Sequence, residues 1–98
     1  MTVQGAQTKT VRRTVLFSGH VQAVGFRYTA QNIARQYEVQ GYVRNLPDGR
    51  VELVAEGAAK ELDRFIDDVK QKMGQFIRRA DVQDSPGTAE FSDFSIRP

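Results

Sequence analysis

The hydrophobic period of this chain changes several times within its 98 residues. Short stretches of β-branched and aromatic residues are typical of strands, whereas two longer segments carry apolar residues at every third or fourth position, which is typical of helices. One helical stripe begins at Phe26 and the other at Leu62. Polar and charged residues cover the rest of each helix, so each helix can bury one side only. The pattern predicts both helices packed together on one face of a sheet.

The predicted elements follow each other with short connections. The helical stripes contain Phe26, Ala30, Ile33, Ala34 and Tyr37 in the first helix and Leu62, Phe65, Ile66, Val69 and Met73 in the second. Strands are predicted over residues 11–18, 42–46, 50–56, 77–82 and 91–96, the last at a sheet edge.

Glycine and proline mark the expected boundaries. We expect Gly41 to end the first helix, Gly57 to begin the second and Gly74 to end it. The sequence Pro47-Asp48-Gly49 predicts a tight turn between two antiparallel strands. Ser85-Pro86-Gly87 is expected to break the fourth strand.

The order of elements is strand, helix, strand, strand, helix, strand, with one strand appended. This order predicts an α+β fold of the ferredoxin-like, split βαββαβ type, in which an antiparallel sheet carries two helices on one face. Residues 1–9 are polar and are predicted to be a disordered lead before a single domain over residues 10–98. Since no apolar stretch of about 20 residues and no signal peptide is found, we expect no membrane association and a cytoplasmic location.

Composition excludes several kinds of site. The chain has no cysteine and one histidine, which rules out a disulfide scaffold, a thiolate metal site, a cysteine nucleophile and a multi-histidine metal site. The formal net charge is +2, and the arginines are scattered among acidic residues rather than clustered. No strand carries the basic-glycine-aromatic pattern of RNA-binding sheets. We therefore expect no nucleic-acid partner.

Residues 19–27, GHVQAVGFR, join the first strand to the first helix. A loop of this kind directs successive backbone N–H groups into one concavity, and the helix N-terminus adds its unpaired donors. Arg27 lies in the first turn of that helix, where its guanidinium can bind two phosphate oxygens. The alternative is that the glycines only shape the turn and that Arg27 is a solvated surface residue.

Residues 41–52 form the predicted hairpin, within which Asn45 is unusual because asparagine is disfavoured in strands. Its amide can orient a water molecule, although it can equally face solvent or support the turn. Asp48 is either a base or, more simply, a turn residue bonded to its own backbone. His20 is either a weak anion contact or an exposed loop residue.

Together the two segments resemble the motifs of the acylphosphatase family. The family loop, Gly-x-Val-Gln-Gly-Val-x-Phe-Arg, is matched here at six of its seven fixed positions, and all six fixed positions of the family hairpin, Gly-x-Val-x-Asn-x-x-Asp-Gly-x-Val, are present. The resemblance covers residues 11–98, and the order of elements agrees with it.

The resemblance implies an enzyme that hydrolyses acyl phosphates to a carboxylate and inorganic phosphate, without metal or cofactor. It implies that Arg27 and the loop amides bind the phosphate and that Asn45 positions the attacking water. The implied phosphate-binding loop consists of Val21, Gln22, Ala23, Val24, Gly25 and Phe26. The expected partner is a small acyl-phosphate substrate, and we expect a chain of this size to act as a monomer.

One position departs from the family pattern. Ala23 stands where the family has its second loop glycine. If this position requires a positive φ, alanine costs on the order of 1–2 kcal/mol. We expect reduced but not abolished activity, and the alternative is a non-catalytic phosphate- or anion-binding module of the same fold. The motif encodes phosphate recognition only, so the acyl group cannot be read from it.

Overall fold

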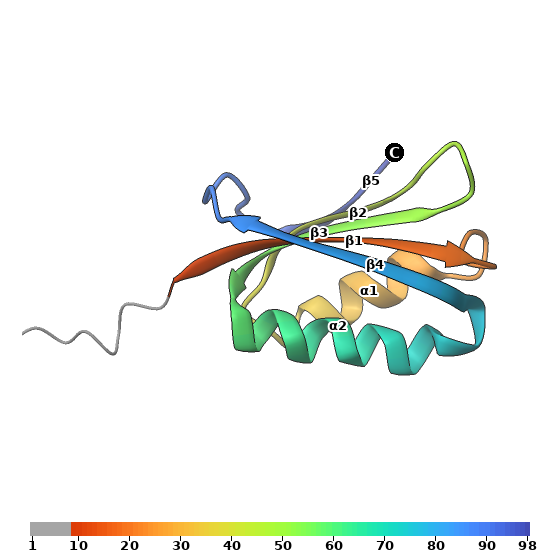
Figure 1. Ribbon diagram of the computed structural model, residues 1–98, viewed down its shortest axis with the longest axis horizontal. Coiled ribbons are helices and arrows are strands. Elements are labelled where there is room, and N and C mark those ends of the chain that lie inside the picture. Colours follow the sequence, from red (N-terminus) through yellow and green to blue (C-terminus); the bar gives the residue numbers. More distant parts are fainter. Residues whose placement is uncertain (1–8) are drawn as a thin grey trace, which may run out of the picture.

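The computed structural model describes residues 9–98 and forms one sheet with two α-helices (Figure 1). Residues 1–8 of the predicted lead, residues 1–9, lie outside the described part of the chain. In order along the chain, the elements are β1 (Thr10–Gly19), α1 (Phe26–Ala34), β2 (Gln40–Asn45), β3 (Val51–Ala58), α2 (Ala59–Met73), the 3-10 turn η2 (Gly74–Phe76), β4 (Ile77–Pro86) and β5 (Phe94–Arg97).

The strands are arranged in the order β4-β1-β3-β2-β5, which confirms the ferredoxin-like prediction. The pairs β1–β3, β1–β4 and β2–β3 are antiparallel, but β2–β5 is parallel. The sheet is therefore mixed, and the prediction of a purely antiparallel sheet is wrong at this edge. Since β4 occupies the opposite edge, the chain crosses the sheet after β4 and adds β5 beside β2 in the parallel direction.

Both helices cover one face of the sheet, as the one-sided stripes predict (Figure 1). The second stripe is buried along its whole length, and most of the first is buried as well. The sheet supplies alternate residues to the same core, among them Val15 and Phe17 of β1, neither of which is exposed. Tyr37 lies beyond the end of α1, because the chain tightens there into turns in which Gln36 and Tyr37 donate to the carbonyls of Ile33 and Ala34.

Two predicted boundaries are wrong because glycine serves the sheet at both positions. Gly41 lies inside β2 with φ 152°, and a Cβ there would stand 1.8 Å from the carbonyl oxygen of Val54. This glycine permits close approach of β2 and β3 rather than ending a helix. Gly57 lies in β3, and α2 begins at Ala59. The predicted stop at Gly74 is confirmed, since α2 ends at Met73.

The fourth strand also differs in length from its prediction. It continues through Pro86, because Val11 of β1 pairs with this residue at the edge of the sheet. Proline is tolerated on an edge strand, where its missing N–H can face away from the ladder. Gly87 therefore marks the end of the strand.

A buried carboxylate holds the chain segment that leads from β4 to β5. Glu56 in β3 is 3% exposed and accepts hydrogen bonds from the Arg12 guanidinium at 2.8 Å, from the Thr88 hydroxyl and amide, and from the Ala89 amide. Burial by itself would raise the pKa of Glu56, but these donors outweigh it and lower the pKa to about 2. The ionised carboxylate thus fixes the start of the crossover.

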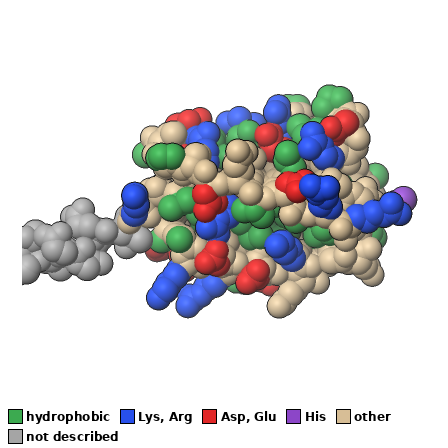
Figure 2. Space-filling view, viewed as in Figure 1, with side chains coloured by type: hydrophobic (Ala, Val, Ile, Leu, Met, Phe, Trp, Pro, Cys, Tyr) green, Lys and Arg blue, Asp and Glu red, His purple; other side chains and the backbone are tan. Residues whose placement is uncertain are grey.

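Several arginines of the strands are paired with acidic residues. Arg13 pairs with Asp84 and Asp63, and Arg44 pairs with Glu52. On the face shown in Figure 2, basic and acidic side chains are interspersed. Over residues 9–98, no helix has the length and apolar character required to cross a membrane.

Replacement of Glu56 tests the network around it. In Glu56→Gln the side-chain amide would face hydrogen-bond donors, and Arg12 would lose its buried partner. We expect the free energy of unfolding at pH 7 to fall by about 3 kcal/mol, measured by urea denaturation. The control is Glu90→Gln, because Glu90 is an exposed partner of the same arginine, and its loss should cost less than about 1 kcal/mol.

The stabilisation that Glu56 contributes depends on pH with a definite sign. The folded-state pKa of Glu56, about 2, lies below its ordinary value of 4.5, so its stabilisation is complete above pH 4.5 and is lost as the pH falls toward 2. The stability difference between wild type and Glu56→Gln should shrink across this window. A difference that stays constant with pH would contradict the assigned role of the carboxylate.

Candidate active site

The loop between β1 and α1 is anchored in the core at both ends. Val21 is not exposed, and Phe26 is 2% exposed with its ring 4.9 Å from the ring of Phe17. Val24 packs against the same core. Since three apolar side chains of the loop face inward, the backbone between them is held at the surface.

Two residues of the loop have left-handed backbone conformations. Gly25 has φ 78° and precedes the first residue of α1, where a glycine adopts this conformation without steric cost. Ala23 has φ 61°, which confirms that this position requires a positive φ. An alanine in this region is strained by about 1–2 kcal/mol, because its Cβ approaches the following carbonyl oxygen.

The loop and the first turn of α1 present a row of free donors. In the part of the chain that the structure describes, no protein acceptor receives the backbone N–H of any residue from 21 to 28. The start of α1 has no capping side chain and no acidic residue in its first turn. Free amides and the positive end of a helix dipole both favour an anion at this position.

One side chain ties this loop to the β2–β3 hairpin. The Gln22 amide donates to the carbonyl oxygens of Leu46 at 2.8 Å and Arg50 at 3.0 Å. Across the hairpin, the Leu46 amide donates to the Arg50 carbonyl, and the Gly49 amide donates to the Leu46 carbonyl. These bonds hold the turn at a fixed distance from the loop. They also place Asn45, the last residue of β2, beside the loop.

The structure brings Arg27 and Asn45 to one small cavity of about 50 Å³. Both side chains are partly exposed, and within residues 9–98 neither forms a hydrogen bond or an ion pair with the protein. The cavity is lined by Val21, Ala23, Gly25, Phe26, Arg27, Tyr28 and Asn45. A phosphate placed there would meet backbone donors, one guanidinium and one side-chain amide.

The other predicted loop residues have different positions. Gln22 and Val24 do not line the cavity, because the first bonds the hairpin and the second packs on the core. Tyr28 does line it, and the sequence analysis missed this residue because it follows Arg27 on the polar side of the helix.

The two remaining candidates have structural explanations. His20 is exposed, and its amide donates to the carbonyl of Phe76, so it is an exposed loop residue as expected. Asp48 accepts a hydrogen bond from the Arg50 amide at 3.1 Å, which is the predicted turn role. The Arg50 guanidinium also bonds Asp48 and lowers its pKa, which makes this carboxylate a weaker base.

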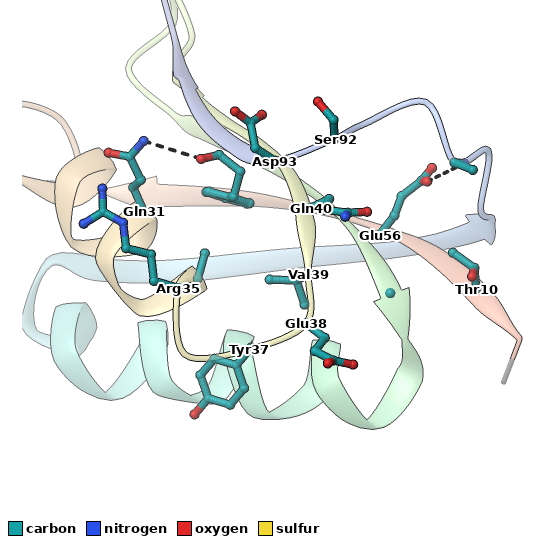
Figure 3. Close-up of a pocket in the computed structure, with 14 residues that line it drawn as sticks. Thr10, Gln31, Arg35, Tyr37, Glu38, Val39, Gln40, Glu56, Ser92 and Asp93 are labelled. Atoms are coloured by element: carbon teal, nitrogen blue, oxygen red, sulfur yellow. Dashed lines mark hydrogen bonds between the residues drawn. The ribbon is translucent and has the colours of Figure 1, made fainter. Parts of the chain in front are cut away.

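A larger hollow than this cavity lies at the other end of β1. This groove of about 760 Å³ is bordered by Thr10, the end of α1 and the segment before β5 (Figure 3). One of its carboxylates, Glu56, is fully engaged by the donors described above. Both acidic and basic side chains border the groove, including Glu38, Asp93 and Arg35. The smaller cavity, with free donors and no lining acid, is the better anion site.

Comparisons with known proteins agree on one family. The family model described as Acylphosphatase matches residues 13–96. An acylphosphatase of Methanospirillum hungatei is 42% identical over 88 residues, which covers 88% of this chain and 96% of that protein. An acylphosphatase of Paenarthrobacter aurescens is 40% identical over 89 residues, with 90% and 95% coverage. The crystal structure of an acylphosphatase from Bacillus subtilis superposes with a TM-score of 0.80 at 32% identity, covering 90% of this chain and 99% of that one.

The strain at Ala23 can be measured against a matched residue, since Ala89 has a similar φ of 59° far from the cavity. Glycine relieves the left-handed strain but gains freedom in the unfolded chain. We expect Ala23→Gly and Ala89→Gly each to raise the free energy of unfolding by about 0.5–1 kcal/mol in thermal or urea denaturation. A loss of stability in Ala23→Gly alone would show that the alanine is not strained there.

Proposed function

This chain belongs to the acylphosphatase family, and we propose that the cavity between its β1–α1 loop and its β2–β3 hairpin is the site of acyl-phosphate hydrolysis. Membership of the family makes the chain an enzyme of this class. The observation that supports the assignment of the site is that Arg27, Asn45 and loop residues with unpaired amides line one cavity.

The loop amides and Arg27 would bind the phosphoryl group. Backbone N–H groups suit its oxygens because they are fixed in place before the substrate arrives. Arg27 adds a permanent charge and a planar pair of donors. As water attacks phosphorus, negative charge on the phosphoryl oxygens is met by donors that need not reorganise, and this lowers the barrier.

Asn45 would hold the attacking water. Its side chain offers an acceptor for a water proton and donors for a phosphoryl oxygen. Asn45 lies at the end of β2, where it pairs with Val51 of β3. Water forms the new bond to phosphorus while the bond from phosphorus to the acyl oxygen breaks. The carboxylate leaves with the electron pair of that bond, and the proton of the water passes to solvent or product.

The modest set of groups at this site suits an activated substrate. A carboxylate is a good leaving group, so the leaving oxygen needs little help from a general acid, and positioning with charge stabilisation can supply most of the rate. This supports a reaction that runs without metal or cofactor. The cytoplasmic location, the monomeric state and the lack of a nucleic-acid partner stay predictions.

The second candidate is a phosphate-binding module that does not turn over, and the strain at Ala23 is the observation in its favour. A methyl group beside the bound phosphate can tilt an amide away from it. We expect Ala23→Gly to increase kcat by about threefold to tenfold, because an amide that the methyl group no longer tilts would bind the phosphoryl oxygens more strongly as their charge grows in the transition state. Ala89→Gly should leave kcat unchanged. A wild type without turnover that binds phosphate would support the module.

Separate variants of Arg27 and Asn45 distinguish the two proposed roles. Arg27→Ala should abolish phosphate binding and lower kcat/KM for benzoyl phosphate by at least about 100-fold. Asn45→Ala should keep phosphate affinity within about twofold while kcat falls by about 100-fold. Affinity would be measured by calorimetry and turnover by the release of phosphate.

Arg35→Ala is the control for charge, because Arg35 lies just after α1 and is exposed away from the cavity. It should match the wild type in both measurements. An unchanged rate in Asn45→Ala would contradict the water-positioning role, and unchanged phosphate affinity in Arg27→Ala would contradict the assigned site.

A further inference from the structure

Tyr28 carries an aromatic side chain that the fold does not use. It is the third residue of α1 and is 71% exposed. The other tyrosines each have a hydrogen-bond partner, because Tyr37 bonds Asp68 and Tyr42 bonds Glu52. Across residues 9–98, Tyr28 has no side-chain hydrogen bond and no aromatic partner. Its ring is therefore available to a ligand.

The cavity beside Tyr28 is small, at about 50 Å³, and its lining residues other than Tyr28 are already assigned to the phosphoryl group, the water or the core. With a phosphoryl group bound there by Arg27 and the loop amides, the acyl group lies at the mouth of the cavity, beside Tyr28.

Few of those residues can contact an acyl group. Val21 and Phe26 belong to the buried core, and Arg27 and Asn45 are assigned to the phosphoryl group and the water. Of the residues that line the cavity, this leaves Tyr28 as the one with a large exposed apolar surface. The lining contains one cation and no acid, so it offers no second charge to match a charged acyl group.

We propose that Tyr28 sets the acyl specificity of this enzyme and that it favours acyl phosphates with a flat, apolar acyl group, such as an aromatic ring, over those with a small acyl group. The inference rests on the proposed function, because it requires the phosphoryl group to occupy the cavity. An aromatic acyl group would stack on the tyrosine ring and bury apolar area on both partners. An acetyl group is too small to do so.

The test compares benzoyl phosphate with acetyl phosphate. In Tyr28→Ala, kcat/KM should fall about tenfold for benzoyl phosphate and change less than about twofold for acetyl phosphate. Tyr28→Phe should match the wild type for both substrates, because the ring rather than the hydroxyl makes the contact. Val82→Ala is the matched control, since Val82 is the other large exposed apolar residue among residues 9–98, at 50%, and does not line the cavity. It should change neither value.

The results separate this inference from the proposed function. If wild type hydrolyses both substrates but Tyr28→Ala lowers kcat/KM equally for the two, or lowers it for neither, the specificity role is overturned and the proposed function stands. A wild type that hydrolyses neither substrate overturns both. Retained acetyl phosphate turnover in Tyr28→Ala shows that the variant is folded and that the loss is specific to the acyl group.

Discussion

The Gln22 side chain bonds the carbonyls of Leu46 and Arg50, and the geometry of the proposed site depends on this link. The loop that carries the free amides and the hairpin that carries Asn45 are separate segments of the chain. The Gln22 bonds set their spacing at the end of the sheet where β1 finishes and β2 turns. Because buried apolar side chains fix the loop from below, a single polar cross-link is enough to position it against the turn. The proposed phosphate donors and the amide proposed to position water are thus arranged before substrate binds, which is a requirement for electrostatic stabilisation of a transition state.

In the proposed site the backbone, rather than a set of reactive side chains, would supply most of the chemistry. The chain has no cysteine and one histidine, and His20 is an exposed loop residue. Two residues of the loop with unpaired amides have left-handed conformations, Gly25 and the strained Ala23. A similar conformation at Ala89 lets its amide reach the buried carboxylate of Glu56. The fold therefore uses positive φ twice to aim N–H groups at an anion, once for a protein carboxylate and once for the proposed phosphate.

Most of the fold follows from the sequence, because each helix has one narrow apolar stripe and each strand is a short stretch of β-branched and aromatic residues. The sheet edge was less predictable, since the pairing of β5 with β2 depends on a crossover held by Glu56, whose partners at Arg12 and Thr88 are distant in the sequence. Gly41 was misjudged for a similar reason, because only the close approach of Val54 shows why a glycine is needed there. At the site, motif spacing identified Arg27 and Asn45 as candidates. Tyr28 required the structure, because exposure beside a cavity has no signature in the sequence.

The most direct test of the account is a titration with inorganic phosphate followed by ¹H–¹⁵N correlation spectra of the wild-type protein. If the loop amides bind the phosphoryl group, saturable shifts should concentrate on the amides of residues 21–28 and on the side chains of Arg27 and Asn45. The groove near Arg35 and Asp93 should remain unchanged. Shifts centred on that groove, or no saturable change in the β1–α1 loop, would contradict the central claim that free backbone donors at this loop form the site.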